Sequence, residues 1–168
     1  MLEGRFFFGF GFDIHPLKEG RKLYLGGVEI PYSQGAYGHS DGDVLLHALI
    51  DAGLSAGGFP DIGTLFPDSD PQFKDIRSSL LLQKTLKLLL SKNLKFYQVD
   101  LTLVLDAPPI APFYSQIKEN LGSLLGLSPE KIGLKARRGE GILFSQDKPA
   151  IMCFALVVLE KLDFSDTL

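Results

Sequence analysis

The sequence predicts an α/β domain (α+β-like), with a mixed β-sheet and helices packed on one of its faces. Strand-like segments come first, and helix-like and strand-like segments then alternate to the end of the chain. The composition, with 45% hydrophobic and 22% charged residues, is that of an ordinary globular protein. A chain of 168 residues without internal repeats can bury a sizeable core, so we expect residues 1–168 to form a single domain.

The first half of the chain supplies strands and one amphipathic helix. Residues 5–15 are predicted to form a strand, with glycines where the backbone comes close to another element or bends. Alternating residues on both sides of Gly26-Gly27 predict a hairpin over 22–30, followed by a loop over 31–40. Residues 41–56 have apolar side chains at helical spacing and predict a helix capped by Ser40 or Asp41.

The second half alternates helices and strands. Residues 57–75 are rich in Gly, Pro and Asp and predict a long loop, a kind of segment that often carries function. A second amphipathic helix is expected over 76–93, a strand over 95–107, and a proline-broken turn into a third helix over 108–127. A short turn capped by Ser128 and strands over 132–138 and 150–162 complete the prediction.

Composition also restricts the partners and the compartment. A net charge of -3 gives no basic face for nucleic acid or anionic lipid, and neither is expected as a partner. No apolar run approaches the roughly 20 residues of a membrane helix, and the N-terminus lacks a signal-peptide cleavage pattern. The single cysteine, Cys153, lies in an apolar strand and is expected to be a buried, inert thiol. These features predict a cytoplasmic protein without a membrane contact.

Two histidines and one aspartate form a candidate metal site. Asp13 and His15 are two residues apart on a predicted strand, so their side chains share a face. His47 lies on the helix over 41–56, four residues from both Asp43 and Asp51, and either carboxylate could orient its ring. Two histidines and one carboxylate with an open fourth position match a catalytic zinc site. Polar surface residues and an ordinary helical histidine are the alternative interpretation.

Three further stretches suit a phosphorylated ligand. His39 and Ser40 stand at a helix entrance, where N–H groups attract anions, although plain helix capping also explains them. Residues 61–70 contain three aspartates, Asp61, Asp68 and Asp70. Aspartate is common in turns, which is one explanation, and the other is that the carboxylates hold a polyhydroxy substrate. Residues 135–141, KARRGEG, are either a solvated charge run or a diphosphate clamp.

Three long motifs give the chain a family resemblance. GFGFDIHPL from residue 9, HSDGDVLLHALIDA from residue 39 and DIGTLFPDSDPQFK from residue 61 resemble 2-C-methyl-D-erythritol 2,4-cyclodiphosphate synthase. The resemblance extends from about residue 9 to about residue 160, more loosely in LDAPPIAP and KARRGEGILF. It implies a homotrimer with active sites at subunit interfaces. The implied reaction converts 4-diphosphocytidyl-2-C-methyl-D-erythritol 2-phosphate to the cyclodiphosphate with release of CMP, in non-mevalonate isoprenoid synthesis.

The resemblance also assigns roles to individual residues. It implies that Asp13, His15 and His47 hold Zn²⁺, that His39 stabilises the transition state, and that Glu140 holds a second divalent metal, Mg²⁺ or Mn²⁺, on the diphosphate. Arg138 stands where the family has a residue that contacts the diphosphate, and Phe144 matches a family aromatic. The further substrate-binding residues implied are Asp13, His15, His39 and Ser40; Asp61, Ile62 and Gly63; Phe66, Pro67, Asp68, Ser69 and Asp70; and, for the cytosine, Leu105, Ala107, Pro108, Pro109, Ile110 and Ala111.

The chain departs from the family pattern in three places. Arg137, Arg138 and Gly139 stand where the family has a Thr-rich run, so arginine charge would replace a threonine hydroxyl. Residues 145–151, SQDKPAI, replace a Gly-Arg-Gly-Glu-Gly run, with Asp147 where an arginine is expected. Pro109 stands where a lysine is usual.

Two other functions remain open at this level. The same three metal ligands could serve a zinc phosphohydrolase with water in the open position, although the long match over 61–70 favours the synthase. A metal-stabilised trimeric binding protein without turnover is the non-enzymatic alternative, and the altered KARRGEG region favours it.

Overall fold

The long strand β1 (Phe6–Glu19) organises a five-stranded sheet. The computed structural model describes residues 4–144 and 147–162. The strand order is β4-β1-β7-β5-β6, in which β5 and β6 are parallel and the other neighbours antiparallel. The other strands of the sheet are β4 (Gln34–Ala36), β5 (Leu94–Val104), β6 (Ile132–Arg137) and β7 (Ala150–Lys161). The predicted mixed sheet is confirmed.

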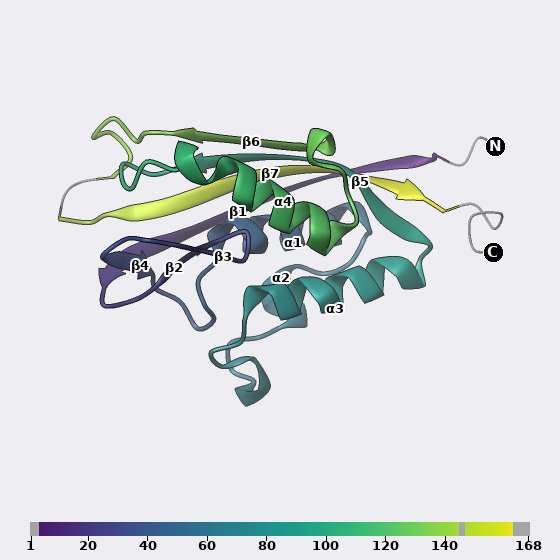
Figure 1. Cartoon of the computed structure of the whole chain (residues 1–168). Coiled ribbons are helices and arrows are strands. Elements are labelled where there is room, and N and C mark those ends of the chain that lie inside the picture. Colours follow the sequence, from purple (N-terminus) through teal and green to yellow (C-terminus); the bar gives the residue numbers. More distant parts are fainter. Residues whose placement is uncertain (1–3, 145–146, 163–168) are drawn as a thin grey trace.

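The helices lie together on one face of this sheet, as predicted (Figure 1). The α-helices are α1 (Val44–Ala56), α2 (Ile62–Leu65), α3 (Ser78–Ser91) and α4 (Tyr114–Leu125). Three 3₁₀ turns join them, η1 (Pro71–Phe73), η2 (Ala111–Phe113) and η3 (Pro129–Lys131), and the predicted hairpin is formed by β2 (Leu23–Leu25) and β3 (Val28–Ile30). A sheet covered on one side only is the outcome expected for an α+β chain.

Alternate residues of β1 face opposite sides of the sheet. The side chains of Phe8 and Phe10 point away from the helices and are 70% and 60% exposed. Gly9 and Gly11 face α1, where a Cβ atom would stand 2.0 Å from the Ala52 carbonyl oxygen and 2.1 Å from that of Ala48, respectively. The two glycines therefore let α1 pack directly on the strand backbone, which is the close approach that the sequence suggested.

Several predicted boundaries were wrong. The cap of α1 is Asp43, not Ser40 or Asp41, because the Asp43 side chain accepts a hydrogen bond from the Leu46 amide and α1 begins at Val44. The expected loop over 31–40 contains β4, and the loop over 57–75 contains α2 and η1. Ser128 takes the cap position of η3 but makes no capping bond with its side chain.

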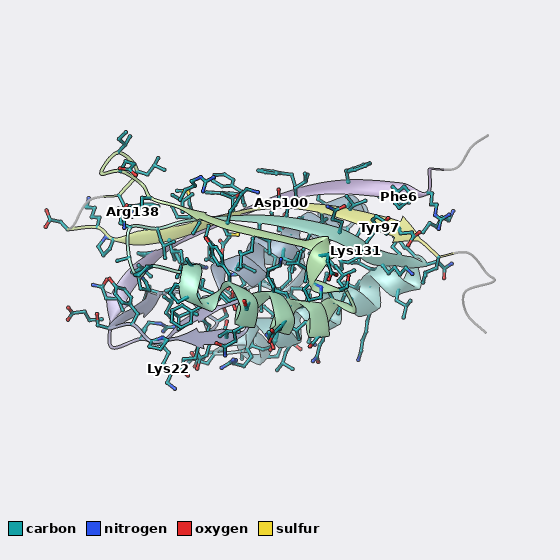
Figure 2. The ribbon with its side chains drawn as sticks, turned by 45° about the horizontal axis from the view of Figure 1, so that its top comes forward. Phe6, Lys22, Tyr97, Asp100, Lys131 and Arg138 are labelled. Atoms are coloured by element: carbon teal, nitrogen blue, oxygen red, sulfur yellow. The ribbon has the colours of Figure 1, made fainter. Side chains whose placement is uncertain are left out.

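The two ends of the sheet carry different side chains. Figure 2 shows Arg138, just beyond β6, at one end, and Phe6 and Tyr97 at the other, with their ring centroids 5.0 Å apart. Cys153 lies in β7 opposite Asp13 and is fully buried. The predicted burial of Cys153 is confirmed, and this burial raises the pKa of its thiol. Within the described residues, no helix is long and apolar enough to cross a membrane.

Candidate metal centre and substrate pocket

Asp13, His15 and His47 meet between β1 and the first turn of α1. Asp13 Oδ2 lies 3.0 Å from both His15 Nε2 and His47 Nδ1, and the two nitrogens are 3.2 Å apart. Tetrahedral zinc with ligands at about 2.0–2.1 Å separates two ligand atoms by about 3.3 Å. The three atoms therefore form a triangle of nearly the right size for such an ion, and their donor set of two imidazoles and a carboxylate suits it.

Each histidine has a partner on the ring nitrogen that faces away from this triangle. His15 Nδ1 lies 3.1 Å from the Tyr37 carbonyl oxygen, which can only accept a hydrogen bond. The proton of a neutral His15 ring is thus held on Nδ1, and its Nε2 lone pair is free for a metal. His47 presents Nδ1 to the triangle, and its Nε2 faces the hydroxyls of Ser78 and Ser40 at 2.8 and 3.0 Å.

The carboxylates expected to orient His47 have other roles. Asp43 is buried and accepts hydrogen bonds from the amides of Gly26, Gly27 and Leu46, which ties the hairpin to the start of α1. Asp51 accepts a hydrogen bond from the Ile62 amide and so holds the start of α2. Helical spacing placed both near His47 in sequence, but each reaches a backbone amide instead.

Burial and mutual attraction have opposite effects on the ionisation of Asp13 and His47. Burial disfavours the charged form of Asp13, but hydrogen bonds and charge from His15 and His47 outweigh it, and the pKa of Asp13 falls well below its usual value. Burial likewise disfavours charged His47, yet Asp13 and the more distant carboxylates raise its pKa overall. The site thus keeps an ionised carboxylate ready for a cation.

A pocket of about 390 Å³ opens beside the two histidines. It brings together most of the residues predicted on the first loop and the Asp-rich segment: His15, His39, Ser40, His47, Ile62, Gly63, Phe66, Pro67 and Asp68. Asp61 instead caps α2 through the Thr64 amide, and Asp70 caps η1 through the Gln72 amide. The lining combines polar side chains, among them the histidines, Ser40 and Asp68, with apolar ones, as in small-molecule sites.

Comparison with known proteins agrees with this geometry. A model of the YgbB family matches residues 6–160. The chain belongs to the YgbB family. It is 44% identical over 153 residues to the 2-C-methyl-D-erythritol 2,4-cyclodiphosphate synthase of Fusobacterium nucleatum, covering 91% of this chain and 96% of the relative. The corresponding synthase of Caldicellulosiruptor bescii is 45% identical over 151 residues, covering 90% and 96%. A solved synthase structure described as the CDP-bound form superposes with a TM-score of 0.84 at 40% identity, covering 91% of this chain and 99% of that one.

In this member of the YgbB family, the predicted cytosine loop lies at a separate hollow. A depression of about 190 Å³ is lined by Leu105, Pro108, Pro109, Ile110, Ala111, Arg137 and Arg138, and it shares no residue with the histidine pocket. Ala107 and Phe144 line a third hollow with Asp106, whose carboxylate accepts a hydrogen bond from the Gly139 amide. The predicted cytosine loop and the two arginines therefore line one hollow.

The two-residue spacing of Arg138 and Glu140 would place both side chains on one face of a strand, but the strand does not extend that far. β6 ends at Arg137, and Glu140 lies in an exposed turn with a φ of 53°. Strand alternation does not apply there, so the relation of the two side chains depends on the turn. Asp147 belongs to the described residues, whereas Ser145 and Gln146 of the altered run lie outside them.

Sequence reasoning missed several residues of the site. Ser78 and Asp41 were expected only as parts of helix ends, and Phe73, Ile76 and Leu81 complete the apolar wall of the pocket. Ser78 lies 31 residues from His47, and no local spacing pattern connects two residues so far apart.

Proposed function

We propose that this chain is a 2-C-methyl-D-erythritol 2,4-cyclodiphosphate synthase. It converts 4-diphosphocytidyl-2-C-methyl-D-erythritol 2-phosphate to the 2,4-cyclodiphosphate and CMP, in the cytoplasm. One observation carries the proposal: His15 and His47, which form a possible metal site with Asp13, line the same pocket as the residues that match the family motifs. The names of the relatives agree with this activity.

The reaction needs positioning and charge neutralisation more than a strong nucleophile. The 2-phosphate of the substrate attacks the β-phosphorus, and CMP leaves in line, so two anions must approach each other. Zinc held by Asp13, His15 and His47 would supply Lewis acidity for the β-phosphate. His39 and Ser40 stand beside this point, where a ring N–H and a hydroxyl can donate to phosphate oxygens as charge develops.

We assign the remaining substrate groups to the residues that match the family motifs. Residues 61–63 and 66–70 hold the methylerythritol part, with apolar contact from Phe66 and a carboxylate at Asp68. Residues 105–111 bind the cytosine, and Arg138 contacts the diphosphate. Glu140 would hold a second divalent ion, Mg²⁺ or Mn²⁺, that neutralises phosphate charge, because a carboxylate is a ligand that these ions prefer.

A homotrimer accounts for two features of the single chain. Phe8, Phe10, Phe12, Ile14 and Leu156 form an exposed apolar face on the side of the sheet that no helix covers. The histidine pocket and the cytosine hollow share no residue, so a site that needs both can be assembled from neighbouring subunits. If the exposed apolar faces of the three sheets pack together, the phenylalanines are buried. The cytosine hollow of one subunit can then lie beside the histidine pocket of the next.

Product analysis tests the activity directly. The protein is incubated with Zn²⁺, Mg²⁺ and the diphosphocytidyl substrate, and the products are identified by mass spectrometry. The cyclodiphosphate together with CMP is expected. Linear phosphate products from hydrolysis would instead indicate a zinc phosphohydrolase, and unchanged substrate with tight binding would indicate a binding protein.

A further inference from the structure

A chain of buried hydrogen bonds runs from His47 away from the pocket. His47 Nε2 lies 2.8 Å from the Ser78 hydroxyl, and this hydroxyl donates to Asp41 Oδ1. Ser78 is fully buried, and the Asp41 side chain is 7% exposed. None of the roles assigned so far uses Ser78 or Asp41.

The direction of these hydrogen bonds is fixed by Asp41. An ionised carboxylate can only accept, and Asp41 Oδ2 already accepts from the Ser78 amide at 3.1 Å and lies 3.2 Å from Arg77 Nε. The guanidinium of Arg77 lies over the Tyr24 ring at 4.1 Å, which holds it beside the carboxylate. With its own proton committed to Asp41, the Ser78 oxygen is left as an acceptor, and the group facing it is His47 Nε2.

We propose that Ser78 and Asp41 are positioning residues that hold the His47 proton on Nε2 and so present its Nδ1 lone pair to the metal. The inference rests on the proposed metal site. A ligating histidine usually donates its other N–H to an acceptor that fixes tautomer and ring orientation. Here the acceptor is a serine hydroxyl oriented by a buried carboxylate, in the place where the sequence suggested Asp43 or Asp51.

The same arrangement determines what Ser40 can do. Ser40 Oγ lies 3.0 Å from His47 Nε2 and accepts a hydrogen bond from the Gly42 amide at 3.2 Å. A protonated Nε2 cannot accept the Ser40 proton, and that proton is therefore available to an acceptor in the pocket that Ser40 lines. A phosphate oxygen is the acceptor that the proposed substrate would bring there.

The segments that carry these residues are also joined through their backbones. The Asp75 amide donates to the His39 carbonyl oxygen at 2.9 Å, and the Asp41 amide donates to that of Ile76 at 3.2 Å. Backbone hydrogen bonds therefore link the segment before α3 to the loop that bears His39 and Ser40. A change at Ser78 has to be tested for loss of this backbone link as well as for loss of its hydroxyl.

The experiment measures zinc affinity in the absence of substrate, by competition with a chromophoric chelator. Ser78→Ala and Asp41→Asn are each expected to weaken zinc binding about 10- to 100-fold, the usual effect of losing such a partner. Asp41→Asn can turn an amide N–H toward Ser78, so that the serine proton points at His47 Nε2 and opposes the metal-binding tautomer. Ser78→Thr keeps the hydroxyl and is expected to keep the wild-type affinity.

Thr85→Val is the matched control, because Thr85 is a fully buried hydroxyl residue on the same helix that donates only to the Leu81 carbonyl. It removes a buried hydroxyl from α3 and is expected to leave zinc affinity unchanged. A second readout is the exchange rate of the His47 Nε2–H proton in the zinc-loaded protein, followed by NMR with ¹⁵N-labelled histidine. Exchange is expected to be faster in Ser78→Ala than in wild type or Thr85→Val.

Zinc affinities within twofold of wild type in folded Ser78→Ala and Asp41→Asn would overturn the proposal. If Ser78→Ala does not fold, Asp41→Asn decides alone, since it leaves the Ser78 side chain in place. Activity of both variants should recover at high zinc concentration, which a merely structural defect would not produce. Wild type that binds zinc through this relay but forms no cyclodiphosphate would refute the proposed function and leave the relay standing.

Discussion

Gly11→Ala should weaken the metal site without changing any of its ligands. A Cβ atom at residue 11 would stand 2.1 Å from the Ala48 carbonyl oxygen and 2.6 Å from the Ala52 amide nitrogen. An ordinary carbon–oxygen contact is about 3.3 Å or longer, so α1 must move away from β1 by about 1 Å. His47 precedes Ala48 on this helix, and its Nδ1 would move away from Asp13 Oδ2, now 3.0 Å distant.

Two measurable effects follow from this displacement. Overpacking of this kind destabilises a folded protein by about 1–3 kcal/mol, which denaturant unfolding measures. Metal sites tolerate deviations of only about 0.2 Å in ligand distance, and a misplacement of about 1 Å can lower a rate about 100-fold. We therefore expect zinc affinity and turnover to fall at least tenfold in protein that is still folded.

Gly9→Ala is the matched comparison, because it makes the same change two residues away on the same strand. Its Cβ atom would meet the Ala52 carbonyl oxygen at 2.0 Å and Ala56 at 2.8 Å, in the second half of α1. Destabilisation should be similar, whereas the loss of zinc should be smaller because the contact is farther along α1 from His47. A folded Gly11→Ala protein that binds zinc as tightly as wild type would refute the argument.

Three further predictions test the proposed site. His47→Ala should remove zinc and activity together while α1 persists, and full zinc content in the purified variant would contradict the assignment. Light scattering should show a trimer, and a monomer that stays active at high dilution would exclude shared sites. Arg138→Ala should weaken CDP binding about tenfold or more at low salt, since a hydrogen bond to a charged partner contributes about 1.5–3 kcal/mol, and the loss should shrink as salt is added. CDP binding is measured by calorimetric titration, with Lys22→Ala as the control for loss of a surface cation. Equal CDP affinities of wild type and Arg138→Ala would show that Arg138 does not contact the diphosphate.

The sequence predicted the elements of the fold well because their signals are local. An aromatic run broken by glycines identified β1, alternation identified the hairpin, and helical spacing identified α1 and α3. The pair Asp13 and His15 was predictable for the same reason, since two residues on one strand share a face by geometry alone. His47 joined them through the family resemblance and a residue pattern, and the structure brings all three together.

Local sequence patterns could not predict the hydrogen-bond partner of each polar side chain. Asp43 looked like a partner for His47 but caps α1 and binds the hairpin amides, because unsatisfied backbone donors at a helix start compete for any nearby carboxylate. Ser78 reaches His47 only because α3 packs beside α1, a tertiary contact that no short window contains. The direction of the Glu140 side chain could not be predicted from strand alternation, because β6 ends at Arg137.

Because side chains alternate along β1, only a deletion or insertion of an even number of residues keeps the following side chains on their faces of the sheet. Removing one residue between Phe6 and Asp13 would exchange the two faces, turning the exposed phenylalanines toward α1 and the metal ligands away from it. Removing two residues would keep the faces but slide the ligands about 6.7 Å past His47. The apolar face and the metal ligands on β1 therefore require a fixed number of residues between Phe6 and Asp13. Evolution can change this segment by substitution, but an insertion or deletion would disrupt the metal centre.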